Sequence, residues 1–221
     1  NAANIGGAIY TNNTLSIDNN EFFRNIANLN GGAVFTLGNI SVSNSNFTQN
    51  NASKGGAIYT NGTASLIYSN FNNNNANYGG AVCIDDNAFV TGSIFKFNNA
   101  KKSGGAIYSN NNIIVNDSSF INNTANAGGA IVTPFNSIIV TYSGFMNNTA
   151  NNYGGSILAP LVNVTETYFI NNFANTNGGA IGATNATVNY CVLLNNNGNT
   201  SSIVYDGNYC NANYNWWGNN T

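Results

Sequence analysis

Short apolar segments of three to five residues alternate along the whole chain with clusters of Asn and Gly. Within a segment the apolar residues occupy every second position, as in the Gly-Gly-Ala-Ile-Tyr run at 55–59, and this period is that of a β-strand. No stretch has apolar residues at the spacing of an amphipathic helix. Asn and Gly tolerate positive φ angles and favour turns. The pattern predicts a chain of strands and turns.

The segments recur in phase along the sequence. Gly-Gly pairs open the repeats, which start at Gly6, Gly31, Gly55, Gly79, Gly104, Gly128, Gly154 and Gly178. A second signature, Phe-x-x-Asn, follows each pair, with Leu193 in place of Phe in the last copy. A pair of the Ile-x-Val type lies between the two signatures. Each repeat of about 24 residues therefore contains three predicted strands.

A repeat of this length matches one turn of a parallel β-helix. A propeller blade needs roughly 40 residues, and a leucine-rich repeat of about 20 to 29 residues would need a second half unlike Gly-Gly-Ala-Ile-Tyr. In a β-helix, equivalent residues stack about 4.8 Å apart. We therefore predict an all-β parallel β-helix, a single segment over residues 1–221 with about nine turns, the last of them degenerate at 201–221. The missing initiator Met suggests a fragment of a larger protein.

Stacking of the repeats creates columns of equivalent residues. We predict that one column forms an internal ladder of hydrogen-bonded amides. Its members are Asn25, Asn50, Asn74, Asn98, Asn123, Asn148, Asn172 and Asn196.

The position after Gly-Gly-Ala-Ile forms a second column, which contains Tyr10, Phe35, Tyr59 and Tyr108. Because the preceding Ile should point inward, these rings should point outward. We expect an exposed stripe that can stack on sugar rings or on another protein. The alternative is that the rings cover the coil as structural ladders or are shielded by loops.

The end of the chain and the cysteines have structural interpretations. Trp216 and Trp217 are expected to cover the last core layer, since a solenoid needs a terminal unit that stops edge pairing. A ligand site there is the alternative. Cys83 and Cys191 fill packing positions. A disulfide between Cys191 and Cys210 is possible, although their columns differ and free thiols are favoured.

Composition narrows the function. Only 5% of the residues are charged, against roughly 25% in ordinary domains, and the chain has no His. The five basic residues give no surface for a phosphate backbone, so we exclude nucleic acid as a partner. The apolar runs are far shorter than the roughly 20 residues that span a bilayer, so we expect no membrane insertion. Polarity comes mainly from the 53 Asn residues.

The carboxylates argue against catalysis. Glycoside hydrolysis needs two carboxylates about 5 to 9.5 Å apart, whereas Asp117 and Glu166 share a column two turns, or about 10 Å, apart. Asp85 and Asp86 occupy another corner and cannot alone supply the six to eight oxygen ligands of calcium. We predict no enzyme, metal site or cofactor. A polysaccharide lyase or hydrolase and a purely structural spacer are the alternatives.

The signatures also resemble those of known surface proteins. Gly-Gly-Ala-Ile with Phe-x-x-Asn resembles the paired tetrapeptides of the chlamydial polymorphic membrane proteins and, more closely, the adhesin-like proteins of methanogenic archaea. The run Asn215-Trp216-Trp217-Gly218 is similar to an element that follows coils in the archaeal group. The resemblance implies a right-handed β-helix, extracellular on a cell surface, and no catalytic residues. We expect a non-enzymatic adhesin or stalk segment whose partner is another cell surface, a glycan or a surface protein, in an oligomeric state that the sequence does not indicate.

Overall fold

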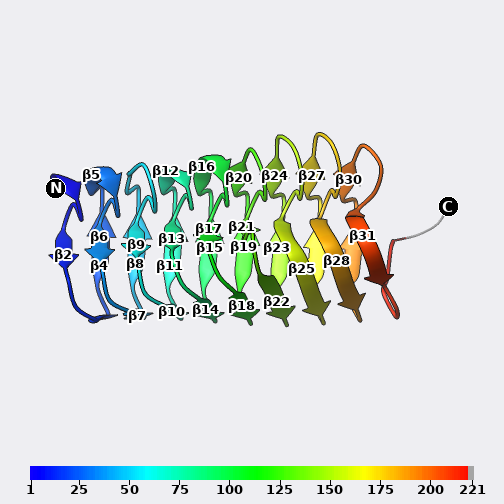
Figure 1. Ribbon diagram of the computed structural model, residues 1–221, viewed down its shortest axis with the longest axis horizontal. Coiled ribbons are helices and arrows are strands. Elements are labelled where there is room, and N and C mark those ends of the chain that lie inside the picture. Colours follow the sequence, from blue (N-terminus) through cyan, green and yellow to red (C-terminus); the bar gives the residue numbers. More distant parts are fainter. Residues whose placement is uncertain (219–221) are drawn as a thin grey trace.

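The computed structural model describes residues 1–218, which form a right-handed parallel β-helix of about nine turns (Figure 1). The turns stack along one long axis, with the N-terminus at one end of the rod. Among the described residues no helix is long and apolar enough to cross a membrane. The predicted fold is confirmed.

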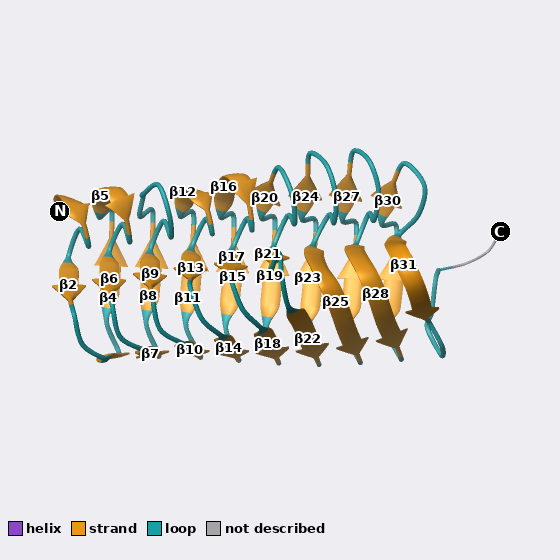
Figure 2. Cartoon of the chain, in the orientation of Figure 1, coloured by secondary structure: helices purple, strands orange, loops and turns teal. Residues whose placement is uncertain are grey.

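Four lines of strands run along the rod, separated by short turns (Figure 2). The first line follows the Gly-Gly pairs and contains β2 (Ile9–Thr11), β6 (Val34–Thr36), β9 (Ile58–Thr60), β13 (Val82–Ile84), β17 (Ile107–Ser109) and β21 (Ile131–Val132). The second contains β3 (Leu15–Asp18), β7 (Ile40–Ser43), β10 (Ala64–Ile67), β14 (Ala88–Thr91), β18 (Ile113–Asn116) and β22 (Ser137–Thr141).

The third line carries the Phe positions and contains β4 (Glu21–Phe23), β8 (Asn46–Thr48), β11 (Asn70–Asn72), β15 (Ile94–Lys96), β19 (Ser119–Ile121), β23 (Gly144–Met146), β26 (Tyr168–Ile170) and β29 (Val192–Leu194). The fourth contains β1 (Ala2–Ile5), β5 (Ile26–Asn30), β12 (Asn75–Tyr78), β16 (Asn99–Ser103), β20 (Thr124–Ala125), β24 (Thr149–Ala150), β27 (Phe173–Ala174) and β30 (Asn197–Gly198). This fourth line adds a strand position to the three that the sequence predicts, because the residues after the Asn ladder also pair between turns.

Near the C-terminal end the first two lines merge into single long strands. These are β25 (Ile157–Thr165), β28 (Ile181–Asn189) and β31 (Ile203–Asn211). In β25 and β28 the connection is shorter, since Val162 lies five positions after Ile157, whereas Ile113 lies six positions after Ile107. In β31 it is longer, and the pairing of β31 with β28 contains a register shift. Pro160, which has no N–H to donate, is skipped in the pairing of β25 with β28.

Equivalent residues of successive turns are paired in register. The pairing of β11 with β15, for example, places Phe71 beside Phe95. The buried Phe rings from Phe22 to Phe169 stack with centroids 4.7 to 5.1 Å apart and planes within 11° of parallel. Together with the inward Ile, Val and Ala side chains they form one continuous core. Each turn thus buries its apolar face largely against its neighbours.

Three positions recur with positive φ: the first Gly of each Gly-Gly pair, the residue before each ladder Asn, and a corner before the Phe strands. At this last corner Asn44, Gly92 and Tyr142 have φ angles of 47°, 59° and 50°. The residue after this corner belongs to a small polar column, as predicted: the Ser69 N–H donates to the Ser93 hydroxyl oxygen in the next turn. Corner side chains such as Tyr142 point to solvent.

The second Gly of each Gly-Gly pair lies where turns approach most closely. A Cβ atom at Gly80 would lie 2.0 Å from the carbonyl oxygen of Gly105 in the next turn. The requirement here is space, because these second glycines do not adopt positive φ.

Candidate binding groove

The predicted aromatic column points away from the main core but is not an open stripe. Tyr10 is 51% exposed, whereas Phe35 and Tyr59 are each only 6% exposed. The prediction that all these rings are exposed is therefore wrong for Phe35 and Tyr59. They form a second small core with Cys83, against which Ile5 and other partly buried side chains pack.

The cover comes from the segment that precedes each Gly-Gly pair. Ile5 and Tyr78 end strands of the fourth line and lie against the column, which is the loop shielding that the sequence left open. Tyr10, Phe35 and Tyr59 stack with centroids 5.4 Å apart. In this half of the rod, the rings act as packing.

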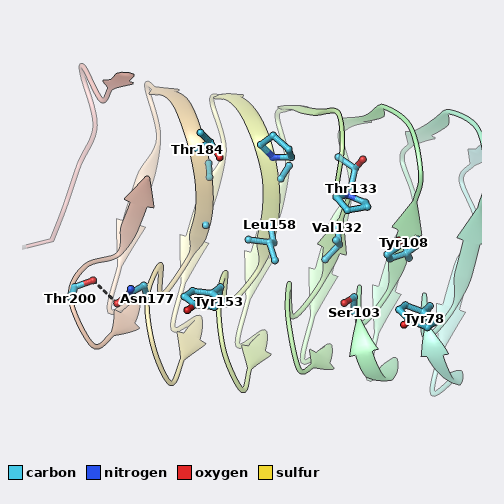
Figure 3. Close-up of a pocket in the computed structure, with 15 residues that line it drawn as sticks. Tyr78, Ser103, Tyr108, Val132, Thr133, Tyr153, Leu158, Asn177, Thr184 and Thr200 are labelled. Carbon is cyan, nitrogen blue, oxygen red and sulfur yellow. Dashed lines mark hydrogen bonds between the residues drawn. The ribbon is translucent and has the colours of Figure 1, made fainter. Parts of the chain in front are cut away.

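A groove opens farther along the same channel, where the column residues become smaller. The column continues from Tyr108 to Val132, Leu158 and Gly182, and these residues form the floor of the groove. The groove has a volume of about 760 Å³. It crosses several successive turns of the rod (Figure 3). A channel filled by Phe35 and Tyr59 upstream is thus open downstream.

The loop wall of the groove consists of residues that precede the Gly-Gly positions. These residues are Tyr78, Ser103, Tyr153, Asn177 and Thr200, and Figure 3 shows them in a row beside the floor residues. The opposite side is lined by Thr133, Pro134, Ala159, Pro160, Ala183 and Thr184. Among the described residues that line the groove, none is Asp, Glu, Lys or Arg. Its chemistry is aromatic, aliphatic and hydroxyl-bearing.

The tyrosines at one end are held by packing and by charge. The rings of Tyr78 and Tyr108 meet edge to face at 5.4 Å, and the Lys102 ammonium lies 5.1 Å from the centroid of the Tyr78 ring. Burial raises the pKa of Tyr108, and Cys83 contributes in the same direction. The Tyr108 hydroxyl therefore stays protonated at neutral pH and can donate a hydrogen bond.

The carboxylates lie outside the groove and bond to the turns. Asp85 accepts hydrogen bonds from the Tyr59 hydroxyl at 2.6 Å and from the Asn110 amide at 3.0 Å. Burial and the bond to Asp85 raise the pKa of Tyr59. Asp86 accepts from the Thr63 hydroxyl at 2.8 Å and from the amide of Asn111. These two carboxylates tie neighbouring turns together.

Asp117 and Glu166 occupy the positive-φ corner that also contains Tyr142. The neighbouring Glu166 carboxylate raises the pKa of Tyr142. Within residues 1–218, no group of three or more His, Cys, Asp or Glu side chains is positioned to hold a metal ion. The corner acids are solvent-exposed turn residues.

The Asn ladder is the most completely bonded feature of the rod. The Asn98 amide donates to the carbonyl oxygen of Phe71 at 2.9 Å and to the Asn123 Oδ1 at 3.0 Å. The Asn98 Oδ1 accepts from both the backbone N–H and the side-chain amide of Asn74, each at 3.0 Å. The same pattern repeats from Asn50 to Asn172, and these amides are buried. All four hydrogen-bonding positions of each amide are filled.

The terminal tryptophans continue the last turn. Trp216 pairs with Val192, which brings Trp217 into register with Leu193 in the Phe column. Leu193 is 3% exposed, while both tryptophans are about half exposed. Their capping role remains a prediction.

The three cysteines are free thiols, with Cys83 and Cys191 buried and Cys210 exposed. In the strand register, Cys210 faces Ala186 rather than Cys191. Burial raises the pKa of Cys83 to about 12.

Sequence reasoning missed the groove while finding its column. Tyr78 and Tyr153 on the loop wall share the position before Gly-Gly, but most repeats have no aromatic residue there, so the sequence shows no aromatic column at this position. The available signal was the absence of aromatic residues from the column after Tyr108, where Val132, Leu158 and Gly182 follow. A regular column that becomes smaller on an outward face indicates a channel that opens.

Comparison with known families supports the repeat. The family model of the Chlamydia polymorphic membrane protein repeat matches residues 44–61, 117–134 and 166–184. Each match begins at the positive-φ corner and includes one Phe-x-x-Asn and one Gly-Gly-Ala-Ile signature. No curated protein and no solved structure matches the chain significantly. The chain is thus similar to this repeat in three separate turns.

Proposed function

We propose that this chain is a non-enzymatic adhesive segment of a cell-surface protein, in which a stiff rod holds a contact surface away from its anchor. About nine turns at a spacing of about 4.8 Å make a rod roughly 40 Å long. The stacked Phe rings and the Asn ladder give it order along its full length. The similarity to a surface-protein repeat, and the resemblance to archaeal adhesin-like proteins, support this location.

The observation that carries the adhesive role is the groove. It runs across several turns, exposes Tyr153 at 48%, and is lined by no acidic or basic side chain of the described chain. A purely structural spacer has no need of such an opening, since Phe35 and Tyr59 fill the same channel upstream. Weak contacts of this kind gain strength when many copies meet a surface together.

The test is binding of the purified chain, displayed in many copies on beads, to a glycan array and to intact cells. Retention on either at physiological salt is the expected result. Beads that adhere to neither would favour the spacer. Release of shortened or unsaturated products from a polysaccharide panel, lost in the Asp117→Asn variant, would replace adhesion with catalysis.

A further inference from the structure

We propose that the groove binds an extended, uncharged polysaccharide chain that lies parallel to the axis of the rod. This inference rests on the proposed adhesive function and names its ligand. It is argued from the shape, the charge and the side chains of the groove, and from the backbone pairing of the strands beside it.

The shape favours a long, thin ligand. Four consecutive turns supply the floor, through Tyr108, Val132, Leu158 and Gly182. The loop wall runs beside it from Tyr78 to Thr200, with no wall residue from the turn of Val132. Turns are about 4.8 Å apart, close to the length of one pyranose unit in an extended chain. Successive sugars can therefore meet successive turns, as in other solenoids that present repeated contacts along one face.

The absence of charge favours a neutral ligand. Burying a charged uronate or sulfate without a partner would be costly, and the lining offers no cation to offset that cost. Lys102, near one end, already lies over the Tyr78 ring. Uncharged sugar hydroxyls need only neutral donors and acceptors.

The side chains match the two kinds of surface on a sugar. Tyr108 and Tyr153 offer aromatic rings for the C–H faces of pyranose units, and their hydroxyls can donate or accept hydrogen bonds. Thr184 and Thr200 add hydroxyl groups at the far end, where the Thr200 hydroxyl already donates to Asn177 at 2.8 Å. In such a mixed lining the apolar surface buries the ligand, and the few polar groups fix its orientation.

A peptide strand is a poorer occupant. A peptide that adds a strand needs an open sheet edge, but β21 pairs with both β17 and β25, and β25 pairs with β28. The backbone groups that such a peptide would use are already bonded between turns. The ligand must therefore be recognised by side chains.

The chain itself shows how to close the groove. Phe35 and Tyr59 occupy the same column and pack in the channel upstream. The double variant Val132→Tyr/Leu158→Phe places equivalent rings in the open part and should keep the fold. As a second, milder change, Tyr153→Ala removes one exposed ring from the loop wall.

The matched control is Tyr142→Asn. Tyr142 lies at a corner outside the groove and has a φ of 50°. Asn44 occupies the equivalent corner of another turn with a φ of 47°, so Asn should be accepted at position 142 without loss of fold. This variant removes an exposed tyrosine outside the groove, and it therefore tests whether any exposed aromatic ring on the rod is enough to hold a sugar.

The measurement is isothermal titration with neutral hexasaccharides chosen from the array and with uronic-acid oligosaccharides of equal length. We expect the wild type to bind a neutral chain, at least a tenfold loss of affinity in the double variant, a few-fold loss in Tyr153→Ala, and no change in Tyr142→Asn. Unchanged affinity in a folded double variant, or loss only in Tyr142→Asn, would overturn the assignment. Cell binding without neutral-glycan binding, or a preference for uronates, would overturn the ligand class while leaving the adhesive function standing.

Discussion

The Asn ladder provides the sharpest test of how the rod is stabilised. Replacing Asn98 by Ala removes four hydrogen bonds and leaves the backbone N–H of Asn74 and one of its side-chain N–H groups without their acceptor. Each unpaired buried donor costs about 1–3 kcal/mol, so the two donors predict a loss of about 2–6 kcal/mol in unfolding free energy. Asn98 lies near the middle of the rod, so its replacement removes hydrogen bonds to both neighbouring turns.

The matched control is the next residue. Asn99 is an exposed Asn whose amide donates to the Asn75 Oδ1 at 2.8 Å in an outer row of amides. Because solvent can replace this bond, Asn99→Ala should cost less than about 1 kcal/mol. The two variants change the same residue type at adjacent positions, and differ mainly in burial.

The assay is urea unfolding followed by far-ultraviolet circular dichroism, with the slope checked for loss of two-state behaviour, as repeat proteins can unfold in parts. Asn98→Asp serves as a third variant, since it keeps the acceptors but loses both amide donors and places a charge in the ladder. It should be more damaging at pH 7 than at pH 3. Equal stability losses for Asn98→Ala and Asn99→Ala would refute the ladder as a source of stability.

Further predictions concern the turns and the thiols. Hydrogen bonds from Thr63 and Asn111 hold the pKa of Asp86 below its usual value of about 3.9. The stabilisation that they give is therefore present above about pH 4 and is lost as the pH falls through the folded-state pKa. In a profile of melting temperature against pH, Asp86→Asn should flatten this acidic part, and an unchanged profile would contradict the prediction. Gly80→Ala should cost about 1–3 kcal/mol or more in thermal unfolding, whereas a neutral result would mean that the turns can move apart. With a thiol-reactive disulfide at pH 8, Cys210 should react in the native protein, while Cys83 and Cys191 should react only after denaturation; native labelling of all three would show that the core opens.

The constant spacing of the repeats predicted the fold because, when turns stack, equivalent residues of successive repeats lie beside one another. The spacing from Asn25 to Asn196 was sufficient to predict the inner ladder, and strand alternation correctly directed Phe35 and Tyr59 away from the main core. Alternation could not predict their burial. Cover depends on the side chain at the end of the fourth-line strand, such as Ile5 or Tyr78, and the residue type at that position is not fixed along the repeats.

The merging of strand lines was also beyond the periodic argument. In β25 it accompanies one fewer residue between Ile157 and Val162, a local change that does not disturb the Gly-Gly phase, whereas β31 is continuous despite a longer connection. The groove lies where this merging and the loss of large column residues coincide. Periodicity predicts what the turns share, and the site arises where they differ.

The most direct test of adhesion without catalysis is affinity electrophoresis of the chain through native gels that contain single polysaccharides, with reducing ends measured in the same gels afterwards. We predict retarded migration in at least one neutral polysaccharide, with no new reducing ends. Unretarded migration in every polysaccharide, or retardation accompanied by newly formed ends, would contradict the account.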